Sequence, residues 1–279
     1  MNIEKQVADY YTHGKLEDKI AGVLRSAGKN FDQLGTEDLA PIDEFHLGGL
    51  EATEALAGFM HLRSGMHLLD VGCGIGGPAR YFAERGCQVT GIDLTEEFIA
   101  LATRLTRRVK LEHKATFRQA SALDLPFAAD TFDGAYEIHV GMNIADKAGV
   151  FREVARVLKP GARFAIYDLM RGKDVPGNDS TLAFPVPWAQ TPETSFVASV
   201  DDYRRGLEAA GFHVEHQRDR RQFAIEFMQR MMSKAASGPP ILRVHVLMGE
   251  QAPLMLKNVN TAIVSGGLIP MELVAIKGE

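Results

Sequence analysis

The chain has 279 residues, of which 31 are Lys or Arg and 36 are Asp or Glu, so its formal net charge is −5. This balance argues against a dedicated nucleic-acid-binding protein, which usually carries an excess of basic residues. A hydrophobic fraction of 46% and a charged fraction of 24% are ordinary for a globular protein and exclude a disordered chain. The two cysteines are too few for a disulfide framework or a cysteine-based zinc site, and we expect no metal site.

Hydropathy along the chain gives no sign of a membrane or secretory segment. No apolar run approaches the length of about 18 residues that can cross a bilayer. The first residues lack the basic-then-apolar layout of a secretory signal. We therefore expect a cytoplasmic protein that is not inserted in a membrane.

The first 60 or so residues show helical periodicity. Leu16, Ile20 and Leu24 fall on one face of a helix, Pro41 is expected to break this region, and the pattern resumes over 49–61. Residues 1–63 are therefore predicted to form a helical N-terminal cover.

From His67 onward, short apolar segments alternate with helical ones. Strands are expected at 67–71, 88–93, 115–120, 134–139 and 163–168, with helices at 77–85, after Thr95 and at 147–158. Such alternation indicates βαβ units and a doubly wound α/β domain with a mostly parallel sheet. We assign residues 64–279 to this domain.

The regular alternation stops after Asp168. Residues 170–198 contain four prolines with Phe184 and Trp188 between them, and an irregular insertion of this length suggests a functional lid. A helix at 201–210, a strand at 213–218, a helical insertion at about 222–266 and a last strand at 268–276 follow. The Met-rich stretch 227–232 is expected to belong to the core, although a substrate cover or an oligomer contact stays open.

The most informative segment is the glycine turn between Asp70 and Gly77. Gly72, Gly74 and Gly77 satisfy G-x-G-x-x-G, in which a strand ends in glycines whose N–H groups can approach a ligand closely. Asp93 ends the next strand, where a carboxylate can accept hydrogen bonds from both hydroxyls of a ribose. This pattern alone fits a nicotinamide dinucleotide as well as another nucleoside cofactor.

Three further features narrow this choice. Asp70 lies two residues before the first glycine, the segment 121–127 precedes Thr131-Phe132-Asp133, and Arg156-Val157-Leu158-Lys159-Pro160-Gly161 leads into the fifth strand. Together these motifs resemble a class I S-adenosylmethionine-dependent methyltransferase. The segments 45–49, 141–147 and 192–196 resemble bacterial small-molecule methyltransferases, including glycine/sarcosine and phosphoethanolamine N-methyltransferases and ubiquinone/menaquinone C-methyltransferases. The resemblance implies a seven-stranded, Rossmann-like sheet.

The resemblance also implies which residues bind S-adenosyl-L-methionine. Position 121, where this family often has an acid that contacts the adenine amino group, is a serine here, so the Ser121 hydroxyl, the Ala122 backbone or Asp124 would take that role. The predicted cofactor-binding residues are Asp70, Gly72, Cys73, Gly74, Gly76, Asp93, Leu94, Ser121, Ala122 and Glu137.

Two histidines stand beside motifs at the carboxyl ends of the strands. An amine or phenol must expose a lone pair before it attacks a methyl group, and a neutral imidazole can accept the proton. We expect His139 to be this base, with His46 as the alternative and Glu137 on the same strand face as His139 to orient it. The predicted acceptor or lid residues are Tyr10, Tyr11, Met142, Asn143 and Trp188.

The sequence thus predicts methyl transfer from S-adenosylmethionine to a small molecule, with an amine nitrogen as the first expectation. A carbon or oxygen of a quinone, phenolic or terpenoid metabolite is the alternative. A nicotinamide-dependent oxidoreductase is less favoured, because such chains usually begin their first strand near the N-terminus and this one does so only at His67. A non-catalytic cofactor-binding protein also stays open. No nucleic-acid partner is expected, and a homodimer is possible.

Overall fold

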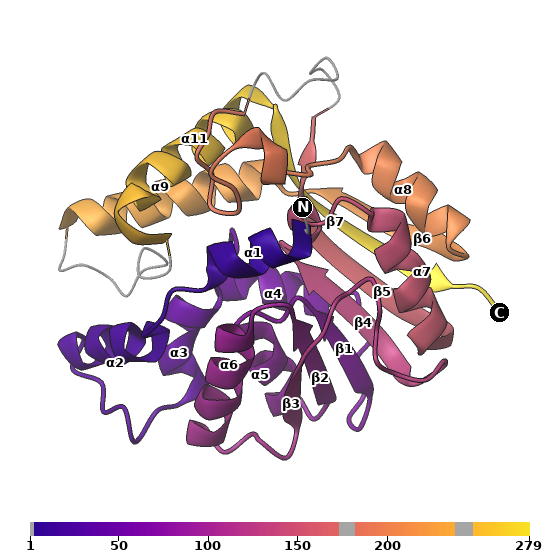
Figure 1. Cartoon of the computed structure of the whole chain (residues 1–279), viewed down its shortest axis with the longest axis horizontal. Helices are drawn as coiled ribbons and strands as arrows, with labels where there is room; N and C mark the ends of the chain where they lie inside the picture. Colours follow the sequence, from indigo (N-terminus) through magenta and orange to yellow (C-terminus); the bar gives the residue numbers. More distant parts are fainter. Residues whose placement is uncertain (1–2, 173–181, 238–247) are drawn as a thin grey trace.

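The computed structural model describes residues 3–172, 182–237 and 248–279, which are built around a seven-stranded sheet (Figure 1). The strand order is β3-β2-β1-β4-β5-β7-β6, with parallel neighbours from β3 to β5 and β7 antiparallel to both β5 and β6. The strands are β1 (His67–Val71), β2 (Gln88–Asp93), β3 (Ala115–Gln119), β4 (Phe132–Ile138), β5 (Leu158–Arg171), β6 (Phe212–Asp219) and β7 (Leu268–Lys277). The predicted doubly wound, mostly parallel sheet is confirmed.

Ten α-helices are present in the described ranges. They are α1 (Ile3–Tyr11), α2 (Leu16–Ser26), α3 (Thr36–Asp43), α4 (Gly49–Ala57), α5 (Gly77–Glu84), α6 (Glu96–Arg108), α7 (Lys147–Val157), α8 (Val200–Ala209), α9 (Arg221–Ser237) and α11 (Ala252–Ser265). None of them is long and apolar enough to cross a membrane.

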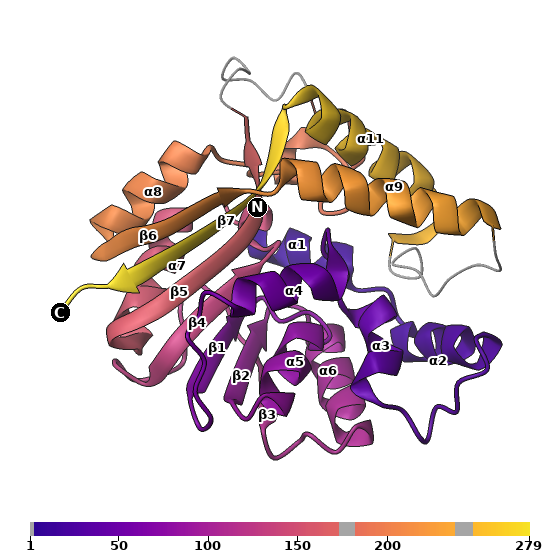
Figure 2. The ribbon, with the colours of Figure 1, turned by 180° about the vertical axis from the view of Figure 1, so that it is seen from behind.

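Helices cover both faces of the sheet. On one face, Leu56 of α4 and Phe82 of α5 pack with Leu68 and Tyr136 of the sheet. On the other face, helices α7 and α8 cover β4 and β5 through a second buried cluster. Figure 2 shows α4 lying across the strands when the molecule is seen from behind. This two-sided burial explains why the strands read as short, nearly continuous apolar runs.

Helix α2 packs on the outer side of α6. Leu16, Ile20 and Leu24 of α2 pack against Leu101 and Leu105 of α6. Pro41 lies inside α3, so the predicted helix break at this residue is wrong. A proline inside a helix removes one N–H donor, and α3 continues past Pro41 only as far as Asp43.

Helices α9 and α11, inserted between β6 and β7, pack together and lie over α1 (Figure 1). The predicted division into residues 1–63 and 64–279 stays a prediction, and residue 63 falls between α4 and β1. Parts of both predicted insertions, residues 173–181 and 238–247, lie outside the described residues.

Candidate active site

A cavity of about 920 Å³ opens at the carboxyl ends of β1, β2 and β4. Its wall combines the glycine turn after β1, the end of β2, the connection after β4, helix α1, the segment 187–190 and the helices α9 and α11. Ligand pockets in proteins measure about 300–1,000 Å³, so this cavity lies near the upper end of that range.

The glycine turn forms one side of the cavity with its backbone. Gly72 and Gly74 have φ values of 72° and 52°, which favour glycine. A Cβ atom on Gly72 would lie 2.5 Å from the Val140 side chain, and one on Gly74 would lie 3.0 Å from the Phe45 ring. The Cys73 N–H donates to the Ile92 carbonyl at 2.8 Å, which ties the turn to β2.

Asp93 connects the glycine turn to the start of α6. Its carboxylate accepts the Gly74 N–H at 3.0 Å through one oxygen and the Thr95 N–H at 2.9 Å through the other. Burial raises the pKa of Asp93, and these hydrogen bonds to the charged form oppose that effect. A carboxylate oxygen has two lone pairs, so Asp93 can accept further donors from the cavity that it lines.

Asp70 is the second carboxyl group on the cavity wall. Asp70 is 2% exposed and the Tyr136 hydroxyl interacts with its carboxyl group, but within the described chain its Oδ2 atom has no partner with good hydrogen-bond geometry. Burial raises the pKa of Asp70 to about 8. A buried carboxyl oxygen without a donor is costly, and a cationic N–H donor in the cavity would remove that cost.

Three predicted cofactor-binding residues do not line the cavity. The Ser121 hydroxyl donates to the Glu4 carboxylate and accepts the Leu123 N–H at 3.0 Å, while Ala122 and Leu123 line the cavity instead. A Cβ atom on Gly76 would lie 2.7 Å from the Phe117 ring. Gly76 is therefore needed for packing of the turn.

The third such residue, Glu137, is buried in the sheet. Burial, and then the nearby charge of Asp168, raise the pKa of Glu137 to about 8. The expectation that Glu137 shares a strand face with His139 is wrong, because β4 ends at Ile138 and His139 has a φ of 56°. The chain leaves the extended conformation between these two residues, and the alternation of faces ends there.

The structure brings His46 and His139 together on the cavity wall. Their ring centroids are 5.9 Å apart, and the His139 ring lies 5.0 Å from that of Tyr167. Burial lowers the pKa of His46 to about 4 and holds the pKa of His139 well below its ordinary value. Both imidazoles are therefore neutral at pH 7 and can accept a proton.

The chain matches the model of a family described as a methyltransferase domain over residues 69–166. It is also 34% identical to methyltransferase GfsG of Streptomyces halstedii over 209 residues, which cover 74% of this chain and 72% of that protein. The chain belongs to the methyltransferase family. S-Adenosyl-L-methionine is its methyl donor, as the resemblance implied.

Other relatives of this methyltransferase act on different atoms. O-methyltransferase resE of Aspergillus sclerotiorum is 29% identical over 77% of this chain and 79% of its own length. Methyltransferase phqN of Penicillium fellutanum is 40% identical, but the match covers only 35% of that protein. Further curated relatives include sterol 24-C-methyltransferases.

Solved structures share the fold of this methyltransferase. The geranyl diphosphate C-methyltransferase of Streptomyces coelicolor A3(2) superposes with a TM-score of 0.73 at 15% identity, over 99% of this chain and 98% of that chain. Structures of phosphoethanolamine N-methyltransferase are also similar. At such low identities these likenesses concern the fold alone.

The predicted lid residues of the methyltransferase meet above the cavity. The Tyr11 hydroxyl donates to Asn143 Oδ1 at 3.2 Å, and the Tyr10 hydroxyl donates to the Pro187 carbonyl at 3.2 Å. Trp188 is buried and donates to Ser195 Oγ at 2.9 Å. Helix α1 is thus joined to the connection after β4 and to the segment that carries Trp188.

The Met-rich stretch of α9, residues 227–232, lines the cavity, whereas its sequence pattern predicts that it belongs to the core. Phe227, Met228, Met231 and Met232 belong to the wall, and Met232 is 67% exposed. Apolar residues at helical spacing give the same sequence pattern whether the face they form covers a core or a cavity.

Proposed function

We propose that this methyltransferase transfers the methyl group to a hydroxyl oxygen of a bulky, largely apolar metabolite, and that the His46–His139 pair takes up the hydroxyl proton. The observation that carries the proposal is the position of two histidine rings, with centroids 5.9 Å apart, on the wall of a large cavity, where burial lowers the pKa of both and favours the neutral form. A base in this position can remove the proton of a hydroxyl group as its oxygen attacks.

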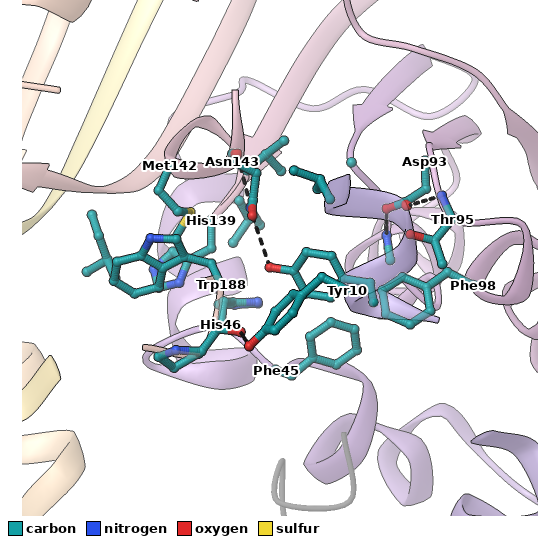
Figure 3. A pocket seen from close by; sticks show the side chains of 18 of the residues that line it. Tyr10, Phe45, His46, Asp93, Thr95, Phe98, His139, Met142, Asn143 and Trp188 are labelled. Carbon is teal, nitrogen blue, oxygen red and sulfur yellow. Dashed lines mark hydrogen bonds between the residues drawn. The ribbon is translucent and has the colours of Figure 1, made fainter. Parts of the chain in front are cut away.

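The two carboxyl groups indicate which end of the cavity binds the cofactor. Asp93 suits the ribose hydroxyls, Asp70 suits the cationic amino group, and the glycine turn leaves room beside both. Figure 3 shows Asp93 and Thr95 on the opposite side of the pocket from His139, Met142 and Trp188, with Tyr10 between them. When bound, S-adenosylmethionine supplies a methyl group whose bond to sulfur breaks as the bond to the acceptor forms.

The acceptor end is apolar. Met142, Leu169, Trp188 and Met228 contribute to its wall, and methionine side chains adapt to ligands of irregular shape. Lys257 is the only Lys or Arg among the described residues that line the cavity. A diphosphate needs several charge-assisted donors, so an acceptor like geranyl diphosphate fits this wall poorly.

An amine acceptor, the first expectation from the sequence, has less support than an oxygen or carbon acceptor. Among the curated relatives described above, resE is named an O-methyltransferase and others are named C-methyltransferases. We favour oxygen over carbon because a hydroxyl group makes direct use of the neutral imidazoles.

The test is an acceptor screen with the purified protein and isotopically labelled S-adenosylmethionine. The panel contains hydroxylated polyketides and phenols, sterols, geranyl diphosphate, sarcosine and phosphoethanolamine, and each product is analysed by NMR to locate the new methyl group. We expect turnover with hydroxylated apolar compounds and a methoxy product. Turnover confined to amines, or methylation at carbon, would contradict the proposal.

A further inference from the structure

His46 is held by hydrogen bonds that fix which of its nitrogens carries the proton. Its Nε2 atom lies 3.0 Å from the Gly49 carbonyl oxygen and 3.2 Å from Thr53 Oγ1. A carbonyl oxygen can only accept, so Nε2 must be the N–H donor of the neutral ring. The lone pair of the ring is then on Nδ1.

Thr53 is itself oriented by a buried carboxyl group. Its hydroxyl donates to Glu44 Oε2 at 2.8 Å, and this oxygen lies 3.6 Å from His46 Nε2. Because the Thr53 proton points to Glu44, the Thr53 oxygen presents its lone pairs to the Nε2–H of His46. Thr53 is fully buried and Glu44 is 4% exposed, so water does not compete for these contacts.

His139 lacks such support. Its Nε2 atom is buried without a hydrogen-bond partner in the described structure, and its ring is placed by contacts with His46 and Tyr167. The two histidines that the proposed function treats as a pair therefore differ: only the imidazole of His46 has its proton position set by neighbouring groups.

We propose that His46 is the member of the pair that takes the proton, at Nδ1, and that Thr53 and Glu44 are positioning residues that keep Nε2 protonated and the ring in place. This inference rests on the proposed function. When Nδ1 gains the hydroxyl proton, the acceptor oxygen keeps the electron pair of the broken O–H bond. The Gly49 carbonyl and the Thr53 oxygen, already aimed at Nε2–H, then stabilise the imidazolium.

The electrostatic surroundings agree with this role. His139 and Tyr167 face His46 from the sheet, and Glu44 faces it from its own segment. Glu44 in turn lies near Asp43, which forms an ion pair with Arg80 at 2.6 Å. Burial and the charge of Asp43 raise the pKa of Glu44 well above its ordinary value. A Glu44 oxygen accepts the Thr53 proton whether or not the carboxyl group is ionised.

The test compares Thr53→Val, which removes the hydroxyl at nearly constant volume, with Thr53→Ser, which retains it. Thr53 does not line the cavity, so we expect Thr53→Val to lower kcat by about 2- to 10-fold with an unchanged KM for S-adenosylmethionine. Thr53→Ser should restore kcat. His46→Gln should cost about 10²–10⁴-fold and more than His139→Gln.

A second readout does not depend on the acceptor. NMR of protein labelled with ¹⁵N-histidine should show His46 protonated at Nε2 in the wild type and in both Thr53 variants, because the Gly49 carbonyl still accepts this proton, with the Nε2 resonance shifted in Thr53→Val alone. Identical kcat and identical ¹⁵N spectra for the two Thr53 variants would overturn the inference, and so would a larger loss in His139→Gln than in His46→Gln. If the acceptor screen gives no methoxy product while these spectra behave as expected, the proposed function is wrong and the assignment of the His46 proton to Nε2 still holds.

Discussion

Asp93 is the residue whose removal should weaken cofactor binding most directly. Replacing it by alanine removes the proposed acceptor for the ribose hydroxyls and also frees the N–H groups of Gly74 and Thr95. We expect the affinity for S-adenosylmethionine to fall by about 1.5–3 kcal/mol for each charged hydrogen bond lost, as measured by calorimetry. Glu96→Gln, an exposed change on the same helix start, is the matched control. Unchanged affinity in Asp93→Ala would remove Asp93 from the site.

Asp70 should make cofactor binding depend on pH. Its pKa of about 8 means that the carboxyl group is mostly protonated at pH 7 in the free protein. A cationic amino group beside it favours the carboxylate, so binding should release up to one proton and tighten as the pH rises from 6.5 toward 8. Calorimetry in buffers of different ionisation enthalpy measures this release. Asp70→Asn should abolish it, and equal proton release in that variant would assign the proton to another group.

At the scale of single residues, the sequence predicts a position best where backbone geometry demands a residue type. Gly72, Gly74 and Asp93 lie where the strand-turn-helix pattern predicts, because a turn at the end of a strand restricts both conformation and contacts. Ser121 and Glu137 could not be placed in this way. The Ser121 hydroxyl donates to Glu4, which is distant in the sequence, and the Glu137 side chain is buried near Asp168 of the neighbouring strand.

Among the structural elements, α1 and the segment around Trp188 should act as a cover. Tyr10→Phe removes the hydroxyl that donates to the Pro187 carbonyl, at a net cost of about 0.5–1.5 kcal/mol. We expect a higher KM for the acceptor and a weaker response of Trp188 fluorescence to ligands, and Trp188 is the only tryptophan of the chain. Asp9→Asn on the exposed side of α1 is the control. If neither ligand changes the Trp188 emission or the protease sensitivity of the wild type, the cover hypothesis is wrong.

The βαβ elements were predictable because the central strands β1, β4 and β5 bury both faces and the helices beside them bury one. The part of the cavity wall that α9 forms could not be predicted in this way. The methionines of α9 have the spacing of a core-facing helix, and only the position of α9 over α1 shows that they line a cavity. Likewise, the sequence around Pro41 does not show that α3 includes this proline and packs against α4 and α5.

For the whole molecule, the buried carboxyl groups should make the protein less stable at alkaline pH. The pKa values of Asp70 and Glu137 are raised to about 8, above those of the unfolded chain, so their contribution is present at low pH and lost as the pH rises. The lowered pKa of His46 acts in the opposite direction, but only below about pH 6.5. Between pH 6.5 and 8 the free energy of unfolding should therefore fall, by up to about 1.4 kcal/mol per pH unit for each carboxyl group.

Urea unfolding at three pH values in this range measures the slope. Glu137→Gln should flatten it, and saturating S-adenosylmethionine should reduce the part due to Asp70. A free energy of unfolding that is constant from pH 6.5 to 8 would contradict the raised pKa values.

Helices α9 and α11 are inserted between two neighbouring strands, and this position makes the segment suitable for exchange to alter the acceptor preference of the enzyme. They leave the sheet after Asp219 and return at Leu268, on two strands that are hydrogen-bonded neighbours, with Asp219 paired to Met271. The Arg221 guanidinium donates to the Val264 carbonyl at 2.6 Å and holds the two ends of the insertion together. The segment therefore joins the sheet at one place, and it contacts the rest of the fold through Arg230, which pairs with Glu51 of α4, and through Asn258, which donates to the Pro185 carbonyl. Exchanging it for that of a relative would change acceptor preference while the strands, the glycine turn and the cofactor end keep their own contacts.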